Sequence, residues 1–193
     1  DQRTLLEAIY SSGMSVLKMV DNSMDLYKME EGRYQLERSW FDLSKMFNIL
    51  SKRWDTIRDA KQLALVFYVN GSVLDSQSEC VVYAEKQTIE NLLANLVENA
   101  LEAAPQNSTV TVSAVRDQSQ FHLEVHNDGV IPKEIRHRFF ERYVTHGKQN
   151  GTGLGTYSAY LITQAHGGSI DFSSNEEEGT RLMVDIPMAE APS

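Results

Sequence analysis

The sequence has little of three things that would otherwise narrow its class: cysteine, long apolar runs and positive charge. Cys80 is the single cysteine among 193 residues, which excludes an internal disulfide and favours a reducing compartment. The longest apolar run, residues 63–69, is far too short to span a membrane. A net charge of -9 argues against nucleic acid or an anionic membrane as the main partner, because both reward clustered Lys and Arg.

The length and the apolar content suit one soluble domain with an appendage. With 193 residues, 41% of them hydrophobic, the chain is able to bury a substantial core. No signal peptide is recognisable, and residue 1 already lies inside a helical pattern. We therefore expect a piece of a longer protein, whose sensor or membrane anchor would lie upstream.

Residues 1–30 predict one long helix, and Gly32 is expected to cap its end. Apolar side chains recur at three- and four-residue steps at Leu6, Ile9, Gly13, Val16, Val20, Met24 and Tyr27. A lone helix cannot hide such a broad face from water, so it needs partners. Two interpretations stay open: half of a dimerising helical hairpin, or a helix packed on its own domain.

From residue 34 onward, helical and strand patterns alternate. Helices are predicted from the cap at Asp42 or Ser44 to Ile57, over residues 85–104, and over residues 154–165. Short strands are predicted at residues 63–69, 80–83, 110–115, 121–125, 169–172 and 180–186. This order predicts an α/β fold, a two-layer α/β sandwich with helices on one face of a mixed sheet, preceded by the long helix.

Three alternating glycines stand immediately before the last predicted helix. The run is Gly151, Thr152, Gly153, Leu154 and Gly155. Glycine allows close approach of a ligand to the backbone, and a helix start offers unpaired N–H donors and a positive dipole end. The run therefore predicts a phosphate cradle, with a simple glycine turn as the alternative.

A row of polar side chains marks the helix predicted at residues 85–104. Asn95, Asn99 and Glu102 stand at positions i, i+4 and i+7, so they share one face. A hydrated Mg²⁺ with nucleotide phosphates would give these groups partners. A polar surface stripe is the alternative.

A second group of polar residues follows the end of the strand predicted at residues 121–125. Strand alternation turns Asn127 toward the interior, where an amide can read the edge of a base, and Gly129 permits close approach. The alternative from this segment alone is an Asx turn that ends the strand.

Residues 127–150 are polar and long for a loop in a compact domain, so they are expected to be functional. Aromatic residues at Phe139 and Phe140 suggest a lid that docks on the domain. Arg142, His146 and Lys148 are able to reach phosphates from it. A solvated basic loop is the alternative.

The four sites, in this order and spacing, resemble the ATP-binding domain of sensor histidine kinases, members of the GHKL superfamily. Residues 24–33 are similar to the end of the second helix of the family's dimerisation hairpin. The resemblance implies a Bergerat-type fold for residues 34–193, the catalytic ATP-binding domain. Residues 1–33 would be the second helix of a truncated dimerisation and phosphoacceptor hairpin.

The resemblance also implies roles for individual residues. Asn95 and Asn99 would be catalytic and close to the phosphates, with Asn99 a ligand of Mg²⁺. Asn127 stands where the family has an Asp that reads adenine. The remaining residues expected at the nucleotide are Glu102, Gly129, Ile131, Arg142, Lys148, Gly151, Thr152, Gly153, Leu154, Gly155 and Thr180.

The sequence departs from the family pattern in three places. Asn127 replaces Asp, and Ile131 replaces a glycine, so Asp128 stays open as the reader of the base although strand alternation argues against it. Glu102 stands where a basic residue is common. The phosphoacceptor box is absent, and none of the five histidines replaces it.

Related ATPases carry a Glu four residues before the metal-binding Asn to activate water, and here that position is Asn95. Glu98 is rotated about 100° around the helix, off the shared face. The prediction is therefore a kinase that uses Mg-ATP to phosphorylate a His on the absent helix, for relay to the receiver domain of a response regulator. The implied setting is a homodimer in the bacterial cytoplasm. The alternative is a catalytically silent module that binds nucleotide or dimerises to regulate a partner kinase.

Overall fold

The computed structural model describes residues 2–145 and 153–188, and the chain divides into two compact units, Asp1–Gln35 and Leu36–Ser193. The first unit contains helix α1, Gln2–Glu30. Gly32, with a φ of +64°, lets the N–H of Arg33 reach the Lys28 carbonyl at 2.9 Å, which closes the helix. None of the helices among the described residues is long and apolar enough to cross a membrane.

The second unit is built on a six-stranded sheet of strand order β3-β2-β5-β6-β8-β7. These strands are β2 (Ala64–Val69), β3 (Ser72–Val73), β5 (Thr109–Arg116), β6 (Gln120–Asn127), β7 (Ser169–Asn175) and β8 (Gly179–Pro187). β2 and β5 run parallel, and the other neighbours run antiparallel, so the sheet is mixed. β1 (Ser39–Asp42) and β4 (Val81–Ala84) form a separate antiparallel pair.

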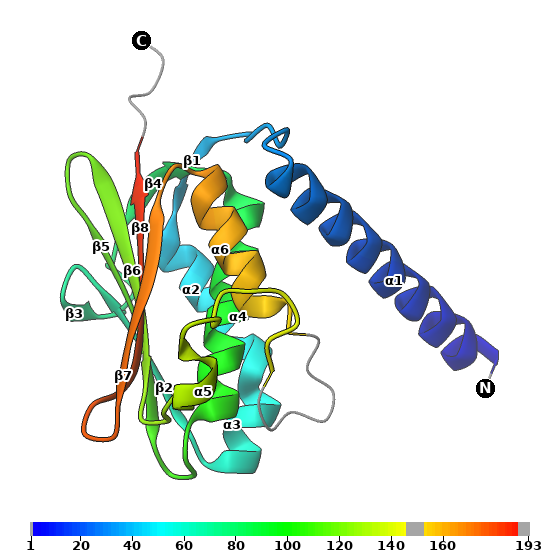
Figure 1. Ribbon diagram of the computed structural model, residues 1–193. Helices are drawn as coiled ribbons and strands as arrows, with labels where there is room; N and C mark the ends of the chain where they lie inside the picture. Colours follow the sequence, from blue (N-terminus) through cyan, green and yellow to red (C-terminus); the bar gives the residue numbers. More distant parts are fainter. Residues whose placement is uncertain (1, 146–152, 189–193) are drawn as a thin grey trace. The chain divides into compact units, whose positions relative to one another are not determined.

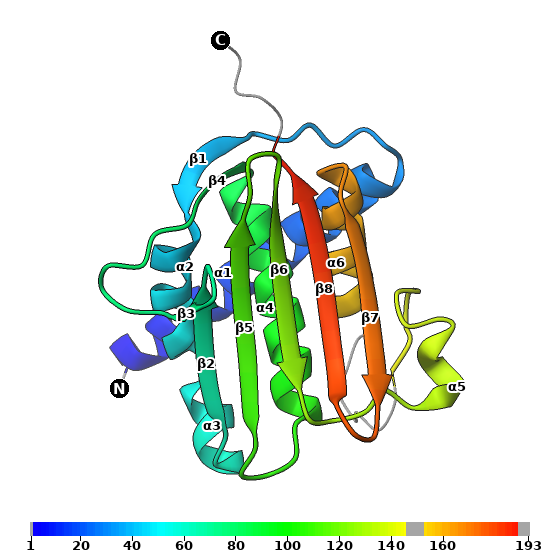
Figure 2. The same ribbon diagram turned by 90° about the vertical axis from the view of Figure 1, so that its left-hand side faces the viewer.

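The helices of this unit lie on one face of the sheet. Figure 1 and Figure 2 show α2 (Leu43–Leu50), α3 (Asp55–Lys61), α4 (Lys86–Ala103) and α6 (Gly155–Ala165) on the same side. The alternation along β6 explains this arrangement, because Phe121, Leu123 and Val125 are buried while His122 and Glu124 are only half-buried. The predicted two-layer α/β sandwich is confirmed.

Residues 42–61 differ from the prediction, because the single helix expected there is interrupted. Asp42 does cap α2, since its Oδ1 accepts the N–H of Ser44 at 3.0 Å. After α2 the chain tightens into the 3₁₀ turn η1 (Ser51–Trp54) before α3 begins. α2 buries five of its eight residues whereas α3 buries none, so the turn separates a core helix from a surface helix. The prediction of one continuous helix is wrong.

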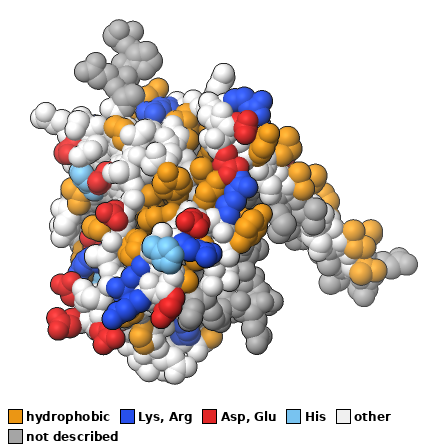
Figure 3. Space-filling view, in the orientation of Figure 1, with side chains coloured by type: hydrophobic (Ala, Val, Ile, Leu, Met, Phe, Trp, Pro, Cys, Tyr) orange, Lys and Arg blue, Asp and Glu red, His pale blue; other side chains and the backbone are white. Residues whose placement is uncertain are grey.

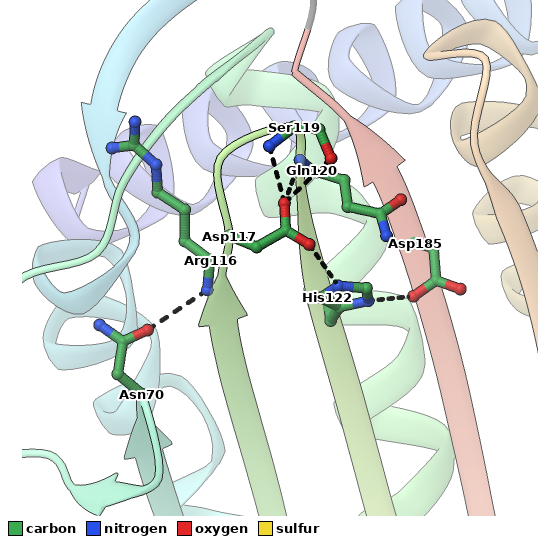
Figure 4. A network of polar contacts seen from close by, with 7 residues as sticks. All are labelled: Asn70, Arg116, Asp117, Ser119, Gln120, His122 and Asp185. Carbon is green, nitrogen blue, oxygen red and sulfur yellow. Dashed lines mark hydrogen bonds and ion pairs between the residues drawn. The ribbon is translucent and has the colours of Figure 1, made fainter.

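Polar side chains tie the β5–β6 hairpin to β8 (Figure 4). The Asp117 carboxylate accepts the N–H of Ser119 at 2.7 Å and of Gln120 at 2.8 Å, and these bonds lower the pKa of Asp117 to about 2. His122 bridges the hairpin and β8, with Nδ1 2.5 Å from Asp185 and Nε2 3.4 Å from Asp117. The hydrogen bond to Asp185 is the main reason that the pKa of His122 is raised.

His166 joins the end of α6 to the start of α4. Its ring is buried, with Nδ1 2.8 Å from the carbonyl oxygen of Ile162 and Nε2 3.3 Å from the backbone nitrogen of Glu85. A carbonyl accepts and an N–H donates, so a neutral ring with its proton on Nδ1 satisfies both contacts. Burial lowers the pKa of His166 to about 4, and Arg38 adds to this effect while the Ile162 carbonyl opposes it.

The folded protein is therefore expected to lose stability as the pH falls. Below pH ~6.5 the unfolded chain protonates His166, whereas the folded chain resists protonation until about pH 4. From pH 7.5 to pH 5 this group should remove about 2 kcal/mol from the free energy of unfolding. His166→Gln keeps an acceptor and a donor but cannot titrate, so it should lack this loss in urea unfolding at the two pH values.

His122→Gln is the matched control for that experiment. The pKa of His122 is raised in the folded protein. The contribution of His122 to stability is therefore present below the pKa of the unfolded chain and is lost as the pH rises through the pKa of the folded protein. Replacing His122 should therefore make the protein lose more stability on acidification, whereas replacing His166 should make it lose less. Equal pH dependence of the wild type and His166→Gln would contradict the assignment of a neutral, buried His166.

Candidate functional site

The asparagine face of α4 lies beside the start of α6. Buried side chains on the opposite side of α4, among them Leu93, Val97 and Leu101, fix the helix in the core. Asn95 and Asn99 are half-buried, and Glu102 is exposed at the end of the same face.

Gly155, the first residue of α6, lies beside these two asparagines. A Cβ built on it would lie 3.3 Å from Asn99 Nδ2 and 3.8 Å from Asn95 Oδ1. A side chain at position 155 would thus meet both amides, and glycine leaves the space beside them open. The structure therefore brings together two groups of residues that are more than fifty positions apart in the sequence.

The helix start itself has the properties expected of an anion site. Leu154 is the N-cap residue of α6, and no side-chain hydrogen bond caps the helix there. The backbone N–H groups of its first turn and the positive end of its dipole lie at the end of α6 where Gly155 meets the two asparagines. Lys148, Gly151 and Thr152 lie outside the described residues.

Gly153 is required by the path of the backbone. Its φ is +65°, and its carbonyl accepts the N–H of Tyr143 at 2.9 Å. A Cβ at this position would lie 2.6 Å from backbone atoms of Tyr143, a distance that real Cβ contacts do not show. The conformation and the contact together allow only glycine where the segment after α5 (Lys133–Arg136) meets α6.

The end of β6 carries a second group of predicted residues. Asn127 and Thr180 face each other in the register of β6 and β8, and both are at least 95% buried. The Thr180 hydroxyl donates to the Gly129 carbonyl at 2.8 Å, and Asn127 Nδ2 donates to the same carbonyl at 3.4 Å. The predicted orientation of Asn127 toward the interior is observed, while Asp128 is exposed.

Ser174 completes this network, and the sequence reasoning missed it. Its hydroxyl accepts the N–H of Ile131 at 2.9 Å and lies 2.8 Å from the Thr180 hydroxyl. Since Thr180 uses its proton on Gly129, the proton between the two hydroxyls comes from Ser174. Ser174 is the partner of Thr180 in the register of β7 and β8. The register of the predicted hairpin was therefore the sequence signal that could have identified Ser174.

Two close backbone contacts hold this network against α4 and β8. A Cβ on Gly129 would lie 2.3 Å from the carbonyl oxygen of Ala103, at the end of α4. A Cβ on Gly179 would lie 2.2 Å from the carbonyl oxygen of Asn127. The asparagines of α4 and the polar end of β6 are therefore joined through direct backbone packing rather than through flexible side chains.

Lys61 holds the end of α4, and the sequence reasoning missed this residue as well. Its Nζ donates to the carbonyls of Leu101, Glu102 and Ala104 at 3.1, 2.6 and 2.8 Å. A cation at the C-terminus of a helix satisfies carbonyls that have no partner within the helix and stabilises the dipole. The sequence carries little signal for this contact, because Lys61 lies forty positions before Leu101.

Arg142, a predicted phosphate contact, lies beside the first turn of α6. Its guanidinium lies 5.1 Å from the ring centroid of Tyr157. Tyr157 follows Gly155 by two residues and so projects about 200° around α6 from it. The contact of Arg142 with phosphate stays a prediction.

The side chains suit a bound magnesium nucleotide. Among the described residues, no group of three or more His, Cys, Asp or Glu side chains could hold a metal ion alone. Mg²⁺ needs no such group, because it is usually held by one or two protein oxygens together with phosphate oxygens and water. The amides of Asn95 and Asn99 beside an uncapped helix start fit that arrangement.

Comparison with known proteins agrees with this geometry. The family model described as "Histidine kinase-, DNA gyrase B-, and HSP90-like ATPase" matches residues 84–190. The histidine protein kinase DivJ of Caulobacter vibrioides is 28% identical over 191 residues, which are 96% of this chain and 31% of DivJ. This chain thus spans about a third of the length of such curated relatives.

Solved structures give the same fold. The catalytic domain of histidine kinase ThkA is 26% identical with a TM-score of 0.67, covering 79% of this chain and 96% of that one. ThkA in complex with the response regulator protein TrrA is 23% identical with a TM-score of 0.65, covering 94% and 50%. The chain therefore belongs to the family of histidine kinase-, DNA gyrase B- and HSP90-like ATPases, and its homologues include sensor histidine kinases.

Proposed function

We propose that this chain binds Mg-ATP between α4, the start of α6 and the end of β6, and passes the γ-phosphoryl group to a histidine on a helix upstream. The observation that carries the proposal is that Asn95 and Asn99 both lie within 4 Å of where a Cβ of residue 155 would stand. It joins an uncapped helix start, which attracts phosphate, to two amides suited to a hydrated cation. When bound, Mg²⁺ would neutralise charge on the phosphate oxygens.

The buried network at the end of β6 supports adenine as the base. Asn127 Nδ2 donates to the Gly129 carbonyl, and this bond fixes which end of the amide faces away from that carbonyl. Asn127 Oδ1 then remains as an acceptor for the amino group of adenine, the role that a carboxylate would have at this position. Thr180 holds the Gly129 carbonyl in place for this arrangement.

The position of Glu98 favours transfer of the γ-phosphoryl group to another molecule over hydrolysis of ATP. It is exposed, off the face that carries the half-buried Asn95 and Asn99, so it is not placed to activate a water beside the phosphates. In the proposed reaction an imidazole nitrogen attacks the γ-phosphorus. The bond to the oxygen that bridges the β- and γ-phosphates breaks, and ADP leaves.

The proposed partners are a second copy of the chain and a response regulator. α1 keeps apolar side chains exposed that need a helical partner: Leu5, Leu6, Ile9, Tyr10, Met14, Leu17, Val20, Met24 and Tyr27. A second copy would cover them in a helical bundle. The complex of ThkA with TrrA supports a response regulator as the final acceptor, because this chain shares its fold.

The proposal predicts transfer of labelled phosphate in the longer protein. The chain extended upstream by the helix that carries the acceptor His should incorporate ³²P from γ-labelled ATP as acid-labile, base-stable phosphate. The 193-residue chain alone should bind ATP without becoming labelled. ATP binding without any transfer in the longer protein would favour the silent regulatory module, and no ATP binding by either would refute the proposal.

A further inference from the structure

The side of α6 that faces away from the two asparagines contains a groove. Residues 136–142 and two tyrosines of α6, Tyr157 and Tyr160, line a hollow of about 560 Å³, here called the lid groove. Tyr157 and Tyr160 project about 200° and about 140° from Gly155 around the helix. The lid groove is therefore separate from the proposed phosphate site.

Aromatic rings form the floor of the lid groove. The ring centroid of Phe140 lies 5.2 Å from Phe139, 5.9 Å from Phe172 and 6.3 Å from Tyr160. Phe172 belongs to β7 and Tyr160 to α6, so the floor is fixed to two elements of the core layers. Tyr160 remains 37% exposed, which leaves an apolar surface for contact.

Cations surround this floor. Arg136, Arg138 and Arg142 lie within seven residues of one another and outnumber the two carboxylates of the same segment, Glu134 and Glu141. Arg136 Nε donates to the Ile131 carbonyl at 2.9 Å, and Arg138 Nε lies 3.5 Å from Glu141. Figure 3 shows Lys, Arg and His side chains on this face of the molecule, with Asp and Glu side chains among them and hydrophobic ones beside them. A positive region on a chain of net charge -9 favours an acidic partner.

The distribution of polar groups favours a protein over a small molecule. Small-molecule sites hold their ligands with a few buried, convergent polar groups. Here Arg138, Glu141 and Arg142 are exposed, and Arg136 is only half-buried. An aromatic floor with arginines at its edge is instead typical of the energetic centre of a protein–protein interface.

We propose that the lid groove docks an acidic segment of a partner protein, with an apolar side chain on the Phe140–Tyr160 floor and carboxylates on the arginines. Electrostatic attraction would set the rate of encounter, and burial of the apolar anchor would provide most of the affinity. The inference does not depend on nucleotide binding, because the groove and the phosphate site lie on different sides of α6.

A defined peptide tests this proposal. A fluorescein-labelled acidic peptide with a central Leu-Phe pair should bind the 193-residue chain in fluorescence anisotropy, more weakly as salt rises. Arg138→Glu should weaken binding about tenfold at low salt, because it reverses a charge at the groove. Tyr160→Ala should weaken it about tenfold at every salt concentration, because it removes part of the floor.

Arg53→Glu is the matched control, since Arg53 is an exposed arginine on η1 and its reversal changes the net charge equally. It should leave peptide binding unchanged, and thermal melting should show that all three variants are folded. Equal weakening by Arg138→Glu and Arg53→Glu would overturn the proposal, as would equal binding of a peptide with Ser-Ser in place of Leu-Phe. Groove-dependent binding of phosphatidylglycerol vesicles without peptide binding would assign the surface to a membrane and also overturn it.

Discussion

Asn99→Ala is expected to weaken ATP binding about 100-fold in the presence of Mg²⁺. The side chain lies with Asn95 against Gly155, at the point where α6 begins, so its removal deletes an oxygen suited to the cation. Alanine favours the helix more than asparagine does, so α4 should stay formed. Isothermal titration with ATP, with Mg²⁺ and with EDTA, measures the effect.

The loss should depend on the metal. In EDTA the affinities of the wild type and Asn99→Ala should converge, because the deleted interaction acts through the cation. Glu98→Ala is the matched control: it is adjacent in sequence, exposed and off the asparagine face, so it should bind Mg-ATP as the wild type does. An Asn99→Ala protein that binds Mg-ATP normally, or a loss of equal size in EDTA, would refute the role given to this side chain.

α4 and α6, which carry the candidate site, could be predicted because the sequence pattern of each helix lies within the helix itself or directly beside it. α4 has nine buried residues at helical spacing, and α6 follows a glycine run that marks its start. The approach of Gly155 to Asn99 followed from placing these two sites at one nucleotide, and the structure shows it directly. Strong local patterns, together with a known order of motifs, were sufficient to predict that the asparagines of α4 lie near the start of α6.

Contacts that depend on strand register or on a local change of helix type could not be predicted. His122 meets Asp185, and Ser174 meets Thr180, only because β6, β7 and β8 pair in one particular register. The single helix expected over residues 42–57 was wrong because its apolar stripe continues through η1 at nearly the same spacing. Apolar periodicity cannot distinguish a 3₁₀ turn of four residues from one more turn of α-helix.

Gly129→Ala is expected to destabilise the second unit by about 3 kcal/mol, near the upper end for overpacking. The added Cβ would lie 2.3 Å from the Ala103 carbonyl oxygen and 2.7 Å from Asn127 Nδ2. Neither neighbour can move freely, since Lys61 holds the carbonyls of Glu102 and Ala104 on either side of Ala103, and β6 holds Asn127 in the sheet. For a domain of this size the change corresponds to a fall in melting temperature of roughly 6–12 °C.

Gly71→Ala separates this steric effect from the conformational freedom of glycine. Gly71 has a φ of +83° but nothing within 4 Å of its added Cβ, so its replacement should cost only about 1–2 kcal/mol of backbone strain. Gly129 lies outside the positive-φ region, so its larger cost would come from the contact with α4 alone. If both variants lost the same stability in calorimetry, α4 would be free to move away from β6, and the rigid link between the asparagines and the base end of the site would not exist.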